Sequence, residues 1–163
     1  MTAKTNSNLP PTIHKKNLAR HFCLKFLFSS GLEFPRKEDF EKKLLDFIPS
    51  YTEKDHEHPY NLYDEKIQKT ALEFLRLLAL RQENIYEILE KNCLKRKFHK
   101  TDKITKCILA LGTCELLYTE TPTKVILNEY INLSKLYADK NSFSLVNAVL
   151  DKVAEQNRKT EGL

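Results

Sequence analysis

The segment TPTKVILNEYINLSKLYADKNSFSLVNAVLDKV, residues 121–153, contains two helix-forming patterns separated by a short polar break. Thr121 is a favourable N-cap residue, and Pro122 suits the first position of a helix. Apolar residues then recur at helical spacing, so the first pattern predicts a helix that runs to about Ala138.

The second pattern follows the break ADKNS, where Asn141 or Ser142 is predicted to cap a last helix that ends near Gln156. Its core-facing stripe is predicted to consist of Leu145, Val146, Val149, Leu150 and Val153. Three residues border that stripe at successive turns, namely Phe143, Asn147 and Asp151. We expect Asn147 to dock against a neighbouring helix, and Phe143 is a candidate for stacking on a nucleic-acid base.

Helical patterns also dominate the rest of the chain. Its 163 residues include only 3 glycines and no convincing run of alternating apolar and polar residues, so an all-α bundle of about seven helices is predicted. The upstream helices are expected at 14–30, 38–47, 63–92 and, after a cap at Thr101 or Asp102, up to Tyr118. Residues 1–13 are predicted to form a flexible arm, and residues 14–163 a single domain of two small helical halves.

The composition, with 41% hydrophobic and 30% charged residues, is typical of a soluble globular protein. There is no apolar run of about 20 residues, the length that a membrane helix needs. The N-terminus also lacks the apolar segment of a secretory signal. The cytoplasm is therefore the expected location.

No metal or cofactor site is predicted. The four cysteines lack zinc-binding spacing and are expected to be small core residues: Cys23, Cys93, Cys107 and Cys114. His56 and His58 alternate with acidic residues, but no third ligand of suitable spacing is nearby. These histidines are expected in a surface loop.

Positive charge is concentrated in two blocks. The net charge is +5, but residues 1–32 contain five basic residues and no acidic one, and residues 91–106 contain seven basic residues against one aspartate. The remaining chain is net acidic. Two basic blocks on such a chain favour an anion-binding surface, with nucleic acid as the leading candidate, although solvated helix ends would also explain them.

Two glutamates fall on apolar helix faces. Glu115 shares an arc with Ile104, Cys107, Ile108, Leu111 and Tyr118, and Glu129 shares one with Val125, Leu133 and Leu136. A buried carboxylate must be paired or hydrogen-bonded. Either the two are catalytic carboxylates in an open cleft, or each accepts hydrogen bonds from helix amides, Asn or Lys and fixes helix docking. The structural alternative is preferred, because no nucleophile or metal motif accompanies them.

The helix that carries Glu129 also has a polar strip, formed by Lys124, Asn128, Asn132 and Lys135. Together with the apolar pattern, this polar strip makes residues 121–153 closely resemble the C-terminal signature of the NusB family. The matching residues are Pro122, Lys124, Val125, Asn128, Glu129, Leu133, Lys135, Ser142, Val146, Asn147, Leu150 and Asp151. Upstream, ITKCILALGTCELL is similar to the family's helix that ends in Tyr-Glu-Leu, and KKNLARHFCLKFLFSS is similar to its Arg-rich first helix.

This resemblance implies an all-α transcription antitermination factor without enzymatic activity. By resemblance, the expected partners are a boxA-type element in nascent ribosomal RNA, the small-subunit ribosomal protein NusE, and elongating RNA polymerase with NusA and NusG. A homodimer that hides the RNA surface is also known in the family. The residues assigned to RNA binding in this way are Lys15, Lys16, Arg20, Lys124, Tyr137, Asn141, Ser142 and Phe143. Glu115, Asn128, Glu129 and Asn147 are assigned to structural polar contacts.

The sequence departs from the family pattern at Leu145, where an aromatic residue is usual, at Ala148, where glycine is usual, and at Ala110, where arginine is usual. Three alternatives stay open. NusB-like domains also occur in ribosomal RNA cytosine methyltransferases, although no methyl-donor domain is present in these 163 residues. The others are a protein-interaction module without specific RNA binding and an enzyme that uses Glu115 and Glu129.

Overall fold

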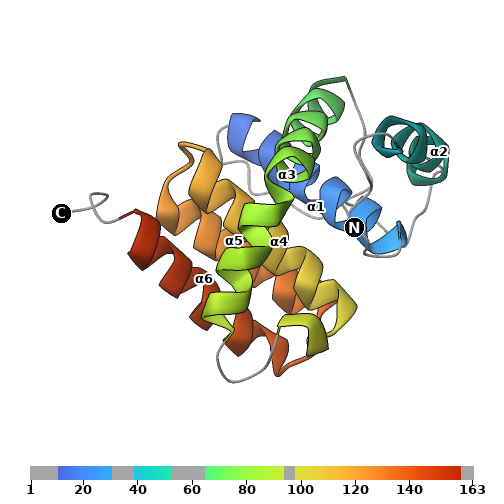
Figure 1. Cartoon of the computed structure of the whole chain (residues 1–163). Helices are drawn as coiled ribbons and strands as arrows, with labels where there is room; N and C mark the ends of the chain where they lie inside the picture. The colour runs from blue at the N-terminus through green and yellow to red at the C-terminus, as the bar shows by residue number, and fades with distance from the viewer. Residues whose placement is uncertain (1–10, 31–38, 53–64, 94–97, 159–163) are drawn as a thin grey trace.

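The computed structural model describes residues 11–30, 39–52, 65–93 and 98–158, and this part of the chain is all-α, as predicted (Figure 1). It contains six α-helices and one short 3₁₀ helix, η1, and no strand. Their bounds are α1 Pro11–Ser29, α2 Phe40–Thr52, α3 Glu65–Asn92, η1 Phe98–Lys100, α4 Lys103–Tyr118, α5 Thr123–Tyr137 and α6 Ser142–Asn157.

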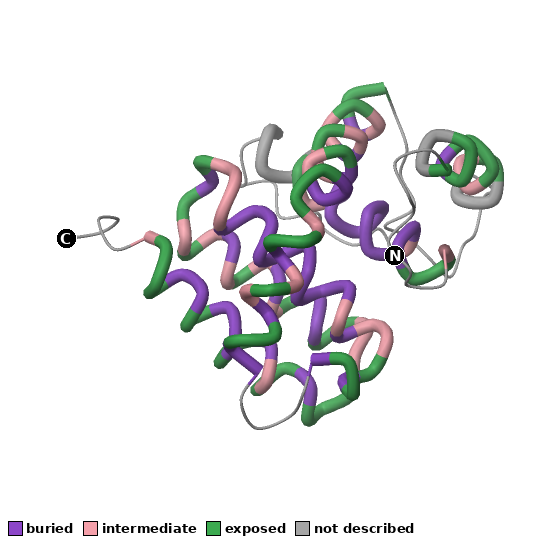
Figure 2. The backbone as a smooth tube through the Cα atoms, in the orientation of Figure 1, coloured by how far each residue is buried: buried purple, intermediate pink, exposed green. Residues whose placement is uncertain are grey.

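Helix α4 forms the centre of the fold and contacts α1, α3, α5 and α6. From Cys107 to Leu116 every residue of α4 is buried, so this helix is enclosed on all sides rather than along one stripe (Figure 2). Gly112 permits the close approach of α6, because a Cβ atom at this position would lie 2.8 Å from Cδ1 of Leu150.

Helices α1 and α3 pack on α4 and on each other with the predicted faces. The predicted stripes are entirely buried: Leu18, Ala19, Phe22, Cys23, Phe26 and Leu27 in α1, and Ile67, Ala71, Leu75, Leu78, Ile85 and Leu89 in α3. Helix α2 lies beside α1, where Phe47 makes edge-to-face contacts with Phe22 and Phe26 at centroid distances of 5.4 and 5.5 Å.

The buried face of α5 differs from the prediction. The helix buries Ile126, Tyr130, Leu133 and Ser134, whereas Val125 is half-buried and Leu136 is 51% exposed. The predicted arc was therefore rotated from the true one. Helix α5 has large apolar residues on both sides, so the sequence does not decide which face is buried. Its packing against α4 decides it.

Several helix ends also differ. Helix α2 continues past Pro49 to Thr52, and α1 begins at Pro11 rather than at residue 14. Asp102 caps α4 as predicted, because its carboxylate accepts the Thr105 amide at 3.1 Å. At α5 the N-cap is Pro122 rather than Thr121.

The core contains all four cysteines as free, buried thiols, which confirms their predicted role. Burial raises the pKa of Cys107 and of Cys114 to about 12, so both are uncharged at neutral pH.

Among the described residues no three His, Cys, Asp or Glu side chains form a metal-binding group. Within the same residues, no helix is long and apolar enough to cross a membrane. The predicted loop with His56 and His58, and residues 1–10 of the predicted arm, lie outside the described residues.

Candidate nucleic-acid interface

A buried ion pair joins α1 to α4. Arg20 donates from Nε to Oε2 of Glu115 at 2.7 Å and from Nη2 to Oε1 at 2.8 Å. Tyr130 of α5 donates its hydroxyl to the same carboxylate. All three side chains are almost completely buried. Burial alone would lower the pKa of Arg20, but the hydrogen bond to Glu115 and the surrounding negative charge raise it, so the guanidinium stays charged.

This geometry corrects the assignment of Arg20. The side chain was expected near RNA phosphates, but it is 1% exposed and its guanidinium is bound inside the fold. Contact with phosphate would require breaking the buried pair. Glu115 does lie on a buried face and holds helices together, but through Arg20 and Tyr130 rather than through helix amides, Asn or Lys.

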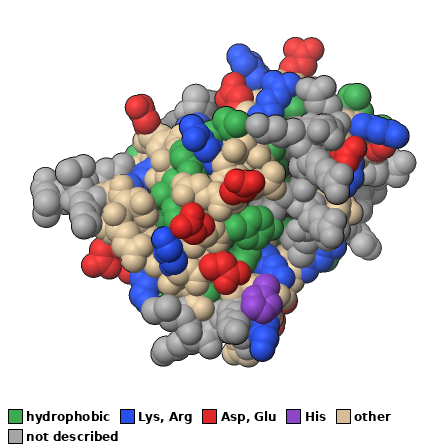
Figure 3. Space-filling view, viewed as in Figure 1, with side chains coloured by type: hydrophobic (Ala, Val, Ile, Leu, Met, Phe, Trp, Pro, Cys, Tyr) green, Lys and Arg blue, Asp and Glu red, His purple; other side chains and the backbone are tan. Residues whose placement is uncertain are grey.

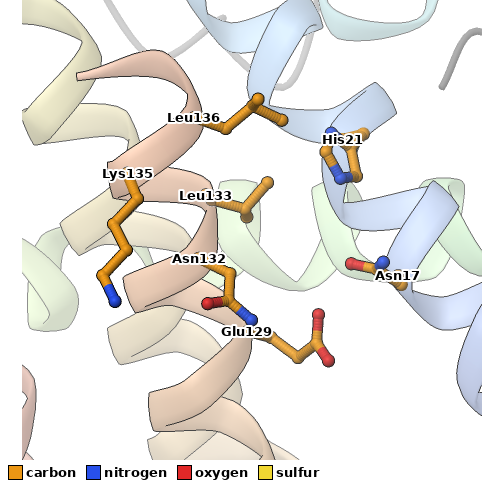
Figure 4. Close-up of a pocket in the computed structure, with 7 residues that line it drawn as sticks. All are labelled: Asn17, His21, Glu129, Asn132, Leu133, Lys135 and Leu136. Carbon is orange, nitrogen blue, oxygen red and sulfur yellow. The ribbon is translucent and has the colours of Figure 1, made fainter. Parts of the chain in front are cut away.

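The second glutamate lies in a groove between α1 and α5, which we call the α1–α5 groove. Its cavity of about 460 Å³ is lined by Asn17 and His21 of α1 and by Glu129, Asn132, Leu133, Lys135 and Leu136 of α5 (Figure 4). Burial raises the pKa of Glu129, while the charge of Arg20 opposes that shift. Glu115 does not line this groove. The two carboxylates therefore do not share this groove.

His21 closes the groove at one end. Its Nδ1 and the hydroxyl of Tyr137 are 2.9 Å apart, and the two rings meet edge to face at a centroid distance of 5.6 Å. Burial lowers the pKa of His21 to about 4, with a further contribution from Lys25, so the imidazole is neutral at pH 7. Tyr137, expected to stack on a base, is half-buried and has Lys25 over its ring at 5.9 Å.

Beyond Tyr137 the surface combines lysines with aromatic rings. We call it the lysine–aromatic surface, formed by Lys25, Lys135, Tyr137, Lys140 and Phe143. Lys135 Nζ lies 5.7 Å from the centroid of Phe143, a ring that is 39% exposed. Lys135, Lys140 and Phe143 also line a shallow pocket of about 280 Å³. Lysines beside exposed rings are the combination that single-stranded nucleic acid requires.

The loop before α6 is organised by Asp139. Its Oδ1 accepts hydrogen bonds from the amides of Asn141 and Ser142, at 3.1 and 3.0 Å, and from the Ser142 hydroxyl at 2.8 Å. Ser142 was expected to contact RNA, but it is 6% exposed and its hydroxyl is engaged in this cap. Asn141 occupies the N-cap position without a side-chain cap bond and is exposed.

The remaining basic candidates lie at the other end of the α1–α5 groove. Lys16 is exposed and lines a pocket with residues 119–122, immediately before α5, and Lys124 is exposed in the first turn of that helix. Lys124 precedes Lys135 by 11 residues, roughly 16 Å along a helix. Neither Lys16 nor Lys124 lines the groove itself, and the pocket beside Lys16 also includes Glu73 and Glu120. The side chain of Lys15 lies outside the described residues.

Two predicted structural amides are exposed instead. Asn128 projects from the polar strip of α5, and Asn147 projects from the border of α6. Neither amide makes a side-chain hydrogen bond to the described residues. The prediction also missed Asn17 and His21, which line the groove. The two residues are four positions apart and so lie one helical turn apart, which was the available signal, but the partner helix could not be inferred.

The chain matches the model of the NusB family over residues 18–155. A protein named transcription antitermination protein NusB from Clostridium botulinum is 27% identical over 146 residues, which cover 86% of this chain and 98% of that protein. The protein of the same name from Lysinibacillus sphaericus is 39% identical over 60% of this chain and 72% of its own length. The protein of the same name from Picosynechococcus is 31% identical, and the match spans only 46% of its length.

Solved structures agree with these matches. A solved structure of T. maritima NusB superposes with a TM-score of 0.70 and 26% sequence identity. The superposition covers 87% of this chain and 92% of the T. maritima chain. A chain in "Crystal Structure of a Plectonemic RNA Supercoil" shares the fold, with a TM-score of 0.67 and 20% identity over 91% of this chain and 99% of that chain. The family match covers most of the chain, from the core of α1 to the end of α6, and the chain therefore belongs to the NusB family.

Proposed function

We propose that this protein is a transcription antitermination factor that binds single-stranded RNA across the α1–α5 groove and the lysine–aromatic surface. The observation that carries the proposal is the set of exposed cations beside aromatic rings. Lys135 and Lys140 form no ion pair with a described residue, and Phe143, which lines the same pocket, is 39% exposed. Phosphates would neutralise the lysines, and a base could stack on the ring.

The groove supplies groups that can distinguish bases. Asn17 and Asn132 each carry one donor group and one acceptor group. RNA sequence is read on the edges of unstacked bases in single strands, which fits a groove lined with amides. Lys16 and Lys124 at one end and Lys135 at the other would hold the backbone.

The partners that we propose are a boxA-type element of nascent ribosomal RNA, the ribosomal protein NusE, and elongating RNA polymerase with NusA and NusG. Relatives named transcription antitermination proteins support this assignment. We propose that the activity is assembly rather than catalysis. The enclosure of Glu115 by Arg20 and Tyr130 supports it, since that carboxylate has no access to a substrate.

The test is fluorescence anisotropy with a short labelled boxA-type RNA and a scrambled RNA of equal length, with and without the NusE-type protein, across a salt series. Selective binding that the partner tightens, and that weakens steeply with salt, is expected. Equal weak binding to both RNAs, unchanged by the partner, would refute the proposal.

A further inference from the structure

We propose that a second surface, formed by Phe28 at the end of α1 and by Lys100, Lys103 and Lys106 around the start of α4, binds the single-stranded RNA that flanks the recognised element. We call it the basic corner. The inference rests on the proposed function, because it extends the same RNA path. It also assigns a role to part of the basic block at residues 91–106, which the α1–α5 groove does not use.

The basic corner has the same construction as the lysine–aromatic surface. Lys103 Nζ lies 4.7 Å from the centroid of the Phe28 ring, and that ring is 44% exposed. A large aromatic side chain at this exposure is available to a base. Lys106 Nζ donates to the carbonyl oxygen of His99 at 2.7 Å, which holds this ammonium group beside η1. Helix α1 thus contributes the ring, and the start of α4 contributes the lysine that lies beside it.

The positive charge of the corner is not neutralised locally. Lys100, Lys103 and Lys106 form no ion pair within the described part of the chain. The nearest acid in sequence is Asp102, an exposed residue whose carboxylate accepts the Thr105 amide and the Thr105 hydroxyl, at 3.1 and 2.8 Å. Glu90 of α3 lies 4.0 Å from Nδ1 of His99. A capping carboxylate already compensates helix amides, so the lysines retain their attraction for an external anion.

Two contacts make the corner continuous with the lysine–aromatic surface. On α1, Lys25 precedes Phe28 by one turn and lies over the ring of Tyr137. The hydroxyl of Ser142, next to Phe143, is 3.4 Å from Oδ1 of Asp102, next to Lys103. An RNA strand that leaves Phe143 or Tyr137 would therefore meet Lys103 and Phe28 next.

The charge pattern around the corner favours RNA as the occupant. Figure 3 shows Lys and Arg side chains above and below a histidine at the lower right of the molecule, with an Asp or Glu side chain directly beside it. Helix α3 carries five acidic and five basic residues and so gives a polyanion no net attraction, whereas the corner presents three lysines.

The experiment compares a short RNA that contains only the element with RNAs extended by several nucleotides on the 5′ or the 3′ side. The wild-type protein, the double variant K100A/K103A and the matched double variant K66A/K69A are titrated at several salt concentrations. Lys66 and Lys69 are exposed on α3, so the control removes the same charge elsewhere. Circular dichroism confirms that all three proteins fold.

At least one extended RNA should bind the wild-type protein and the control more tightly than the short RNA does. K100A/K103A should lose that gain but bind the short RNA normally. Loss of two phosphate contacts should reduce the slope of log affinity against log salt concentration for the extended RNA by about 1.4. Over a fourfold rise in salt, the affinity of the variant should therefore fall roughly seven-fold less than that of the wild-type protein.

A second readout isolates Phe28. With 2-aminopurine in the extension, stacking on Phe28 should quench its fluorescence, and F28L, which keeps an apolar side chain, should relieve the quenching. Normal binding of the short RNA without any gain from either extension, or a gain that survives in K100A/K103A, would overturn the inference alone. If the wild-type protein does not bind the short RNA selectively, that result would instead refute the proposed function.

Discussion

Arg20 of α1 and Glu115 of α4, 95 residues apart, form a bidentate ion pair in the core, with Nε–Oε2 and Nη2–Oε1 distances of 2.7 and 2.8 Å. The pair joins the first helix to the central helix, and Tyr130 extends it to α5. Because α1 and α5 are also the two walls of the α1–α5 groove, the same buried cluster fixes the spacing of the proposed RNA site.

Replacing Arg20 with methionine should destabilise the fold strongly. The variant leaves the Glu115 carboxylate buried with only Tyr130 as a partner, and breaking one side of a buried pair costs about 3–5 kcal/mol. Urea denaturation followed by circular dichroism measures this loss. K124A, which removes an exposed cation from α5, serves as the control and should change stability by less than about 0.5 kcal/mol. Equal stability of R20M and K124A would contradict the structural role of the pair.

The importance of this pair explains where prediction from sequence failed. An arginine in a basic block is expected on the surface, because arginine is almost never fully buried unless it is paired. The partner that overrides this rule, Glu115, was identified as buried, but nothing in the sequence connects two residues 95 positions apart. The assignment of Arg20 to phosphate followed from that missing contact.

Periodicity predicted the helices that have one apolar face. The stripes of α1 and α3 are buried as expected, because each helix packs its one apolar face into the core. Helix α4 is enclosed on all sides, and a stripe cannot be assigned to such a helix. In α5, Leu136 is exposed while Tyr130 is buried against Glu115, a choice that depends on tertiary contacts.

Stability should fall in acid because of His21. Its pKa is lowered from 6.5 to about 4 in the folded protein, so the unfolded chain binds more protons between these values. The contribution of His21 to stability is therefore complete above pH 6.5 and is lost as the pH falls toward 4, by at most about 1.4 kcal/mol per pH unit. Urea midpoints across this range should decline less steeply for H21Q than for the wild-type protein.

The comparison with H21Q provides the control for that titration. Other groups titrate in the same range, including Glu129, whose raised pKa acts in the opposite direction. The difference between the wild-type and H21Q curves removes their contribution. A flat difference curve between pH 6.5 and 4 would show that His21 is not held neutral.

The cap formed by Asp139 should stabilise the start of α6. Asp139 accepts two amide hydrogen bonds and the Ser142 hydroxyl, and loss of a capping side chain costs about 0.5–2 kcal/mol. D139A should therefore unfold at a lower temperature than the wild-type protein in a thermal scan. D151A removes an exposed carboxylate from the interior of α6 and should have little effect. If both variants unfold together, the cap contributes no stability.

RNA affinity should depend on Lys135 and Phe143 in different ways. K135A removes a phosphate contact, so affinity should fall for every RNA and the salt slope should decrease by about 0.7. F143L keeps an apolar side chain but removes the stacking surface, so it should weaken binding by about 1–3 kcal/mol with the salt slope unchanged. Anisotropy titrations at several salt concentrations separate the two effects, with K152A on α6 as the exposed control. A slope that falls equally in K152A and K135A would show that net charge, rather than the lysine–aromatic surface, attracts the RNA. Unchanged affinity in F143L would exclude stacking on this ring.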